Sequence, residues 1–372
     1  MVVDKRHKIK FDPAFAVAVL ALVAVGLVAD YSATYTMGCG RHTLFYKQIF
    51  WITGGLVLMG LIAAVDYRRL ERWGYVLYGV ALTLLLAVLV TGRTGMGAQR
   101  WLPLGPFSFQ PSEIAKLLLI VTLAKYFSED RITSGHTLRQ LVKPSLLVML
   151  PVLLVVKQPD LGTGLMLLFI FAAVVIAAGI RLKSFVYITV TAALSAPLAW
   201  AFFWKHLKDY QRKRLLVFVD PEADPAGAGY HIIQSKIAVG SGMLYGKGYL
   251  HGTQSQLSFL PERHTDFIFS VISEEWGFLG SLVVILVFLF IIMWGLDTAN
   301  KAKDRFGSLL AVGCVAMIFF HVFINVGMTI GLMPVVGVPL PLVSYGGTSA
   351  LTTLMALGLL LNINMRRFKL FY

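Results

Sequence analysis

Long apolar runs separated by short polar stretches dominate the chain. A helix that spans the hydrocarbon core of a bilayer needs roughly 20 predominantly apolar residues. Apolar and polar residues do not alternate with the period of two that is typical of a membrane β-barrel. The sequence therefore predicts an all-α polytopic membrane protein with about ten transmembrane helices, at Pro13–Tyr35, Leu44–Val65, Trp73–Val90, Gln110–Phe127, Lys143–Val156, Thr163–Ile180, Phe185–Phe203, Phe267–Trp294, Gly307–Ile330 and Leu342–Ile363.

Composition supports this assignment. Of the 372 residues, 57% are hydrophobic and 14% are charged, and the mean hydropathy is +0.75. Soluble domains are nearer half apolar and a quarter charged. The first apolar run lacks a clear small-residue cleavage site, so a cleavable signal peptide is not expected. The two cysteines, Cys39 and Cys314, predict no disulfide framework, and no Cys/His spacing typical of a metal site is present.

The formal net charge of +14 reflects membrane topology better than nucleic-acid binding. Basic residues fall in alternate polar segments, as they do when those segments face the cytoplasm. An even number of helices then places both termini in the cytoplasm. The predicted inner segments carry Lys5, Arg6, Lys8 and Lys10; Arg68, Arg69 and Arg72; Arg131, Arg139 and Lys143; Arg181 and Lys183; Lys301, Lys303 and Arg305; and Arg366, Arg367 and Lys369.

The opposite side holds the irregular segments. The largest, from about Trp204 to Thr265, separates the seventh and eighth predicted helices, and loops of that length are usually functional or disordered. Within it, Tyr230–Val239 suits a short amphipathic helix at the interface. The glycine-rich Gly240–Gly248 predicts a flexible turn with one cation. We treat residues 1–372 as one transmembrane domain with this loop as an insertion.

The segment LSFLPERHTDFIF, residues 257–269, concentrates the chain's chemistry. Glu262, Arg263, His264 and Asp266 lie within five positions, and a long apolar run follows directly. A carboxylate at such a boundary is costly unless it is used, paired or hydrated. The structural alternative is a helix N-cap, in which Thr265 or Asp266 accepts hydrogen bonds from the first turn.

Helical spacing places Asp266, Ser270, Ser273 and Glu274 on one face. This polar stripe is either part of a site or a seam between helices.

Other polar residues lie in or beside apolar runs. Glu113 and Lys116 are three apart and can pair on one helix face, for structure or to keep a polar cavity open. Asp160 lies at a helix end, where capping competes with a site role. His321, Asn325 and Tyr345 are single polar positions for which packing or a hydrogen bond is the simpler explanation.

Five long motifs in the chain resemble those of a known protein family. They are RWLPLGPFSFQPSEIAKL (100–117), QPDLGT (158–163), GYHIIQSKIAVGSG (229–242), FLPERHTDFIF (259–269) and VVGVPLPLVSYGGTS (335–349). Together they cover nearly the whole chain, and it resembles the SEDS family of peptidoglycan glycosyltransferases. Arg263 within FLPERHTDF favours the elongation type over the division type. Met243 departs from the family pattern, which usually has glycine there.

The resemblance implies an enzyme of the bacterial cytoplasmic membrane that polymerises lipid II at the outer leaflet during cell elongation. The family's essential aspartate matches Asp266, its buried Glu–Lys pair matches Glu113 and Lys116, and Asp160 matches a further important position. The family works with a class B penicillin-binding protein, a transpeptidase, and other elongation-complex proteins are expected partners. No nucleic acid and no organic cofactor are implied.

The residues suit that chemistry. We expect Asp266 to be the general base for the 4-hydroxyl of the acceptor sugar. Cations would offset charge on the diphosphate leaving group, and Glu262 and His264 would support the site. A divalent cation, Mg²⁺ or Mn²⁺, would be bridged by substrate phosphates, since no complete protein ligand set is evident. Two alternatives stay open: a lipid II flippase, and a non-catalytic scaffold for a transpeptidase. The predicted cations are Arg212, Arg214, Lys236, Lys247 and Arg263.

Overall fold

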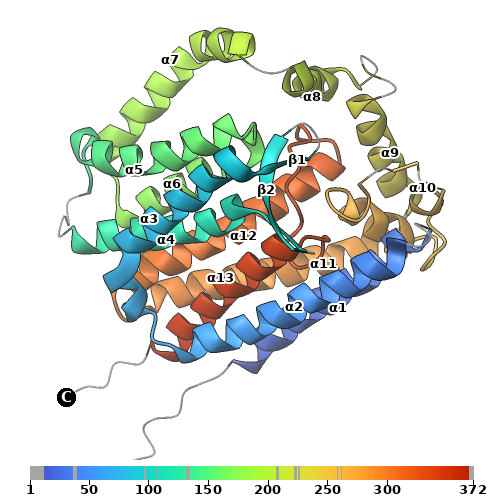
Figure 1. The fold of residues 1–372 in the computed structure, drawn as a ribbon, viewed down its shortest axis with the longest axis horizontal. Helices are drawn as coiled ribbons and strands as arrows, with labels where there is room; N and C mark the ends of the chain where they lie inside the picture. Colours follow the sequence, from blue (N-terminus) through green and yellow to red (C-terminus); the bar gives the residue numbers. More distant parts are fainter. Residues whose placement is uncertain are drawn as a thin grey trace, which may run out of the picture.

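The computed structural model describes residues 12–36, 40–95, 98–105, 107–130, 135–206, 209–221, 224, 227–257, 259–260 and 262–367. Long helices dominate them (Figure 1). These are α1 (Pro13–Thr34), α2 (Gly40–Ala64), α3 (Arg68–Thr91), α4 (Pro111–Glu129), α5 (Leu138–Lys157), α6 (Leu161–Ala178), α7 (Leu182–His206), α11 (Ile268–Asn300), α12 (Arg305–Thr329) and α13 (Gly347–Met365). Each coincides with a predicted apolar run.

Eight helices in the described part of the chain are long and apolar enough to cross a membrane: α1, α2, α3, α5, α6, α11, α12 and α13. The helix α4 carries four charged residues, Glu113, Lys116, Lys125 and Glu129. The apolar part of α7 is the shorter stretch Leu182–Leu198. Figure 1 shows α7 running along the top of the view, apart from the other helices, and its residues 185–198 are exposed.

Local sequence explains where several helices begin. Proline is tolerated in a first helical turn because its missing N–H would have no partner there, and both Pro13 and Pro111 occupy that position. Asp304 accepts a hydrogen bond from the Gly307 amide at the start of α12. Thr137 and Gln140 form a capping box on α5. The core gathers around α12 and α13, most of whose residues are buried.

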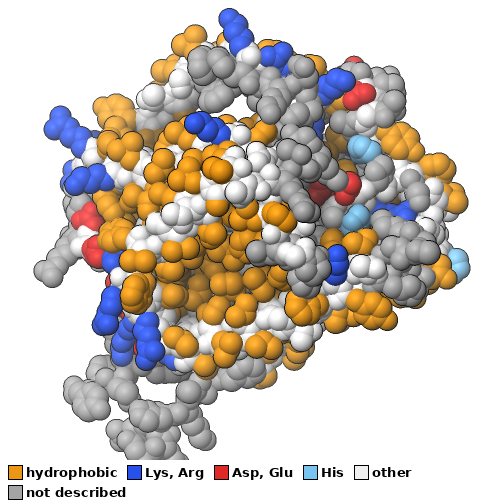
Figure 2. All heavy atoms as spheres, viewed as in Figure 1, with side chains coloured by type: hydrophobic (Ala, Val, Ile, Leu, Met, Phe, Trp, Pro, Cys, Tyr) orange, Lys and Arg blue, Asp and Glu red, His pale blue; other side chains and the backbone are white. Residues whose placement is uncertain are grey.

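One end of the helix bundle collects the basic segments, and we call it the basic end. Arg68 pairs with Asp304 across 3.0 Å, and Arg305 donates to the Asp130 and Ala178 carbonyls. Arg366 donates to the ends of α2 at Ala63 and Ala64. Figure 2 shows lysines and arginines along this edge, beyond a broad hydrophobic surface. This grouping is the one that the alternation of basic segments predicts. Of those predicted segments, residues 5–10, Arg131 and Lys369 lie outside the described residues.

The opposite end, which we call the loop end, contains structure that the sequence did not reveal. The strands β1 (Arg93–Gly95), β2 (Ala98–Leu104) and β3 (Phe107–Phe109) form a three-stranded antiparallel sheet in the order β1-β2-β3. Three short helices, α8 (Asp209–Val219), α9 (Ala228–Ser241) and α10 (Thr253–Gln256), belong to the largest loop. The helix predicted at Tyr230–Val239 is thus present as α9. Its buried face, with Ile232, Ser235 and Ala238, packs on α11.

The glycine-rich turn after α9 is bound to a break in α11. Gly277 has φ 68°, which interrupts the helical ladder and leaves backbone groups without helical partners. The turn supplies them: the Phe278 amide donates to the Met243 carbonyl across 2.8 Å, and the Lys247 amide donates to the Glu274 carbonyl across 3.0 Å. The sequence predicted a turn here but not these backbone hydrogen bonds, which tie it to α11.

Candidate active site at the loop end

Asp266 lies two residues before α11 and is half-buried. The N-cap position is Phe267, and no side chain caps the first turn. The capping role that the sequence offered for Thr265 or Asp266 is therefore not what the structure shows. The described residues donate no hydrogen bond to the Asp266 carboxylate. In the described part of the chain, the Asp266 carboxylate therefore makes no hydrogen bond that stabilises the fold.

Three hydrogen bonds from other elements fix the backbone around Asp266. The Asn325 amide nitrogen on α12 donates to the Asp266 carbonyl across 3.0 Å and to the Val338 carbonyl across 2.8 Å. Ser344 donates to the Thr265 carbonyl across 2.6 Å, and the Tyr345 amide donates to the His264 carbonyl across 2.8 Å. Asn325 and Tyr345 therefore position the site, a role that single polar residues in apolar runs do not disclose.

Charged side chains from three other segments act on Asp266. Burial is the main reason that the pKa of Asp266 rises to about 6, and the Glu262 carboxylate raises it further. Arg214 and Arg100 oppose this rise, and Asp160 adds to it. A carboxyl with a pKa near neutral pH can accept a proton and release it again, which suits a general base.

A cavity of about 70 Å³ lies beside these charges, between α8, the start of α6 and the segment after α12. Arg100 and Arg214 both line it. Arg214 donates to the Val335 carbonyl across 3.2 Å, and Arg100 donates to the Pro159 carbonyl across 2.6 Å. Arg100 Nε also lies 3.7 Å from Asp160 Oδ2, so two guanidinium groups and one carboxylate leave a net positive charge at this wall, which can receive an anion.

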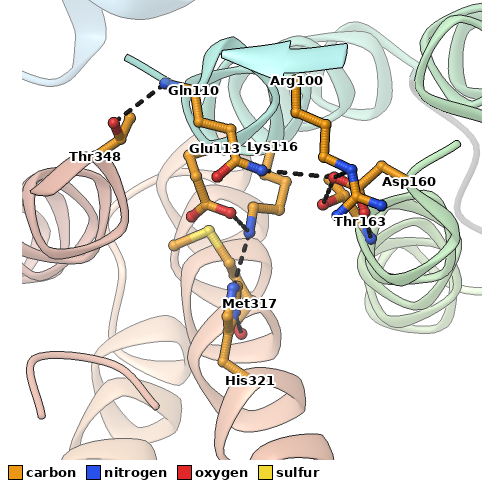
Figure 3. Close-up of polar contacts among 9 residues, drawn as sticks. All are labelled: Arg100, Gln110, Glu113, Lys116, Asp160, Thr163, Met317, His321 and Thr348. Atoms are coloured by element: carbon orange, nitrogen blue, oxygen red, sulfur yellow. Dashed lines mark hydrogen bonds and ion pairs between the residues drawn. The ribbon is translucent and has the colours of Figure 1, made fainter. Parts of the chain in front are cut away.

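Asp160 serves two purposes. It caps α6, because its carboxylate accepts from the Thr163 amide across 3.2 Å and from the Thr163 hydroxyl across 2.9 Å. The same carboxylate lies 3.7 Å from Arg100 Nε and 3.5 Å from Gln110 Nε2 (Figure 3). The predicted cap is confirmed, and the site role of Asp160 stays a prediction.

Glu113 and Lys116 pair as predicted. Lys116 Nζ lies 2.8 Å from Glu113 Oε1, and both side chains are buried. Figure 3 shows His321 of α12 pointing at the same ammonium, with Nε2 at 2.8 Å. His321 is thus hydrogen-bonded within a charged cluster, which its apolar sequence neighbours do not suggest.

Only one of the five predicted cations, Arg214, is found beside Asp266. Arg263 is 3% exposed and donates to the Ala33 carbonyl, the Ser255 carbonyl and the Thr36 hydroxyl. Burial lowers the pKa of Arg263. Its guanidinium therefore fastens the loop to the end of α1.

The other three cations also serve the loop. Arg212 donates to the Trp204 and Lys205 carbonyls near the end of α7. Lys247 pairs with Glu274 across 2.8 Å, and Lys236 lies over Gly331. Arg100, which was not among the predicted cations, acts on Asp266 together with Arg214. Its signal in the sequence was its position in the conspicuous loop RWLPLG.

The polar stripe on α11 is a seam beyond Asp266. Ser270 contacts the Ser235 hydroxyl of α9 at 2.7 Å, and Ser273 accepts from Ser281 at 2.8 Å. Glu274 accepts from Lys247 and from the Gln254 amide at the start of α10. These contacts fasten the large loop to α11 and leave Asp266, which precedes the helix, as the member of the stripe at the site.

Glu262 and His264 flank Asp266 in the chain. Glu262 accepts from the Thr265 hydroxyl across 3.1 Å. The His264 ring packs on Tyr345 with 5.6 Å between centroids, and its Nδ1 is buried without a partner. Burial lowers the pKa of His264. In the described part of the chain, no three His, Cys, Asp or Glu side chains are grouped so as to hold a metal ion.

The fold and the site define an integral membrane protein that carries, at one end of its helix bundle, two guanidinium groups and a carboxylate that accepts no hydrogen bond from the described residues. The family model described as "Cell cycle protein", which covers FtsW, RodA and SpoVE, matches residues 13–369. The chain belongs to this family, the SEDS family, as its motifs predicted, and RodA-type members are among its relatives.

Individual relatives match over nearly their full length. The peptidoglycan glycosyltransferase MrdB of Escherichia coli strain K12 is 42% identical over 97% of this chain and 95% of its own. The peptidoglycan glycosyltransferase RodA of Treponema pallidum is 33% identical over 96% and 98%. A solved chain from a peptidoglycan synthase complex superposes with TM-score 0.81 at 36% identity, over 96% of this chain and 99% of its own. RodA of Thermus thermophilus superposes with TM-score 0.70 at 31% identity, over 96% and 98%.

Proposed function

We propose that this chain is a peptidoglycan glycosyltransferase that polymerises lipid II into glycan strands during cell elongation, with Asp266 as its general base. One observation carries the assignment of the base: the Asp266 carboxylate is held by its backbone yet accepts no hydrogen bond from the described residues. The names of relatives such as MrdB and RodA support the reaction class.

The reaction joins a sugar hydroxyl to an anomeric carbon. Asp266 takes the proton of the acceptor 4-hydroxyl as the new C–O bond forms, and the bond to the diphosphate breaks on the opposite face. A single displacement of this kind inverts the α-linked donor to a β-linked product. The raised pKa of Asp266, about 6, strengthens it as a base while leaving it mostly ionised at neutral pH.

The diphosphate leaving group belongs beside Arg100 and Arg214. Both guanidinium groups line the cavity next to Asp266, and planar guanidinium groups bind phosphate oxygens in pairs. A divalent cation, Mg²⁺ or Mn²⁺, would depend on the diphosphate of the substrate for most of its ligands, because Glu262 and Asp266 alone make a short ligand set, and it would offset the charge of the leaving group. Removing the cation with a chelator should stop polymerisation, and adding either ion back should restore it.

The loop end faces the outside of the bacterial cytoplasmic membrane in this proposal, and ten helices cross the bilayer. Arginines and lysines gathered at the basic end support an inner position for that end and for both termini. Single cysteines placed at Gln99 and at Arg69, in a variant without Cys39 and Cys314, test this. A membrane-impermeant maleimide should label the first and spare the second in spheroplasts.

The competing function is that of a flippase, which moves lipid II from one leaflet to the other. It needs a route for the lipid headgroup between the two leaflets. Below the Glu113–Lys116 pair, the bundle is filled by buried apolar side chains such as Leu310, Cys314 and Leu357. This packing favours chemistry at one membrane face over transport through the bundle.

The transpeptidase partner is a class B penicillin-binding protein in this proposal. A groove on this chain can accommodate the single membrane helix of that partner. An apolar groove of about 660 Å³ runs between α11 and α12, from Leu296 to Ile330. The α12 part, from Val312 to Ile330, is roughly 27 Å long, close to the thickness of the hydrocarbon core. A photocrosslinker at Phe319 should capture the transpeptidase, and one at Val186 on α7 should not. Capture of lipid alone at Phe319 would contradict the assignment of this groove to the transpeptidase helix.

The experiment that decides the function uses the purified protein, with and without the transpeptidase, incubated with lipid II and a divalent cation. Products are resolved by glycan length. Asp266→Asn is compared with Asp304→Asn, which changes a carboxylate at the basic end and keeps a side chain able to cap α12. We expect polymer from the wild type and from Asp304→Asn, and a loss of about a thousandfold in Asp266→Asn.

Two outcomes contradict the proposal in different ways. Polymer from well-folded Asp266→Asn at the wild-type rate keeps the enzyme and removes the general base. The absence of polymer under every partner and ion condition favours the flippase, which a lipid-translocation assay detects, or the scaffold.

A further inference from the structure

His321 is a buried histidine with a defined tautomer. It is 3% exposed, and its Nδ1 lies 2.7 Å from the Met317 carbonyl one turn earlier in α12. A carbonyl can only accept, so Nδ1 carries the proton. Nε2 is then an acceptor, and it lies 2.8 Å from Lys116 Nζ. The imidazole is therefore neutral and accepts a hydrogen bond from the lysine ammonium.

The same ammonium donates to Glu113 Oε1 across 2.8 Å. An ammonium has three N–H donors, so Glu113 and His321 together hold two of them. We call Glu113, Lys116 and His321 the buried triad. Figure 3 shows its members converging from α4 and α12 below Gln110.

A small cavity leads from the buried triad toward Asp266. Its walls include the triad, Gln110, Thr163 and Gly337, and its volume is about 30 Å³. A methyl group built on Gly337 would lie 3.4 Å from Asp266 Oδ2. The cavity thus extends from Lys116 to Gly337, whose backbone lies next to the Asp266 carboxylate.

We infer that His321 is a positioning residue for glycosyl transfer: by accepting a hydrogen bond from Lys116, it holds the ammonium at the base of the cavity that ends beside Asp266. This inference rests on the proposed function. Lysine has a flexible four-carbon stem, so one ion pair alone leaves its ammonium several orientations. The imidazole removes that freedom because it is itself fixed through Met317.

Loss of the hydrogen bond between His321 and Lys116 affects Asp266 through α12. Asn325 lies one turn beyond His321 and holds the carbonyls of Asp266 and Val338. Val338 also lines the cavity above Lys116. An ammonium that loses its imidazole acceptor turns toward other acceptors of this cavity, because a buried donor without a partner is costly. Val338 lines this cavity and its carbonyl accepts from Asn325, so a displaced ammonium disturbs the hold of Asn325 on the Asp266 carbonyl.

Simple packing is the alternative role, and side-chain chemistry separates the two. Phenylalanine fills the space of an imidazole but cannot accept from Lys116, whereas the amide oxygen of glutamine can. His136 is the matched control: it is equally buried, bonded to the Gly179 carbonyl across 2.7 Å, and located at the basic end.

The activity arm compares His321→Phe, His321→Gln and His136→Phe with the wild type in lipid II polymerisation. We expect His321→Phe to lower kcat about tenfold to a hundredfold, with KM changed less than about twofold. His321→Gln should recover to within about threefold of the wild type, and His136→Phe should keep the wild-type kcat per folded molecule. Full activity of His321→Phe, or equal loss in His321→Phe and His321→Gln, overturns the inference.

The second arm does not depend on polymerisation. The protein has eight histidines, and ¹⁵N-histidine labelling with solid-state NMR in lipid reports the tautomer of each. The signal lost in His321→Gln should be that of a neutral Nδ1–H ring, and Lys116→Met should shift its Nε2 resonance. An imidazolium, an Nε2–H tautomer or an unshifted resonance contradicts the link to Lys116. If the wild type makes no polymer, the proposed function fails while this arm still decides the contact.

Discussion

Asp266 and Glu113 are two carboxylates in the same half of the molecule, and the protein treats them in opposite ways. Glu113 is 4% exposed and is neutralised by Lys116 at 2.8 Å. Asp266 is half-buried, and the described residues donate no hydrogen bond to its carboxylate. Burying a charge is tolerated only when a partner offsets the loss of water. The difference separates a carboxylate that pairs within the bundle from one that accepts no hydrogen bond from the described residues, and the proposed function assigns the second to catalysis.

The basic end extends this comparison. Asp304 accepts from Arg68, from the Tyr67 hydroxyl and from the Gly307 amide, so its carboxylate is fully engaged. Arg305 is engaged by the carbonyls of Asp130 and Ala178. Charges at this end join helices to one another. The loop end differs because the Asp266 carboxylate accepts no hydrogen bond from the described residues, although the charges of Arg100 and Arg214 act on it.

The largest effect on the fold is expected from breaking the buried pair. Lys116→Met leaves the Glu113 carboxylate buried without its partner, which costs about 3–5 kcal/mol. The double variant Glu113→Gln/Lys116→Met removes both charges and should recover much of the lost stability. We expect neither variant to polymerise lipid II. Thermal unfolding in lipid nanodiscs measures the order of stabilities. Equal stability of the single and double variants contradicts the assignment of Glu113 and Lys116 to an architectural pair.

Asn325 allows a sharper test because the chain offers a matched asparagine. Asn325→Ala removes the donor to the Asp266 carbonyl, and we expect kcat to fall about tenfold to a hundredfold. Asn362→Ala removes a buried donor to the Ile62 and Val65 carbonyls at the basic end. Each variant should lose about 1–3 kcal/mol of stability. Polymerisation assays should separate them, and equal activity in the two variants removes the positioning role of Asn325.

The pH dependence of the reaction tests the surroundings of Asp266. A general base acts when deprotonated, so kcat/KM should rise as pH increases through about 6. The Glu262 charge raises the pKa of Asp266, and the Arg214 charge lowers it. Glu262→Gln should therefore move the midpoint of the acid limb to lower pH, and Arg214→Ala should move it to higher pH.

These shifts are read from initial rates between pH 5 and 8, independently of the absolute rate. Arg214→Ala will also lose rate if Arg214 binds the diphosphate, but the midpoint reports only the base. Arg305→Ala, at the basic end, serves as the control and should leave the midpoint in place. Shifts of the same sign in Glu262→Gln and Arg214→Ala contradict the assignment of the limb to Asp266.

The helices were predictable, and the surroundings of Asp266 were only partly so. Apolar runs predict spanning helices because every residue of a run contributes to the signal, and helix termini were located by Pro13 and Pro111. The sheet β1–β3 and the binding of the Gly240–Gly248 turn to α11 depend on contacts between distant segments. Local pattern carries no information on such contacts, so both were missed.

The cations show the same limit. Arg263 lies close to Asp266 in sequence, and Lys247 belongs to the same predicted loop. This proximity made both residues candidates for binding the diphosphate. Their side chains point instead to Ala33 and Glu274. Arg100, far away in sequence, is brought to Asp266 by the packing of β2 against α3 and α4. Sequence predicts which residues carry charge, while the fold decides where each charge points.

The smallest effect should come from the exposed pair at the basic end. Arg68 and Asp304 lie 3.0 Å apart, but their side chains are 44% and 31% exposed, and water screens such pairs to less than about 1 kcal/mol. Arg68→Ala should therefore change neither polymerisation nor unfolding temperature appreciably, whereas Asp304→Ala also removes the cap of α12 and should cost about 1 kcal/mol. Thermal unfolding of the two variants in nanodiscs measures this difference. A loss in Arg68→Ala as large as that in Lys116→Met would show that burial does not separate the two classes of ion pair, because charge pairing alone would then account for stability at both ends.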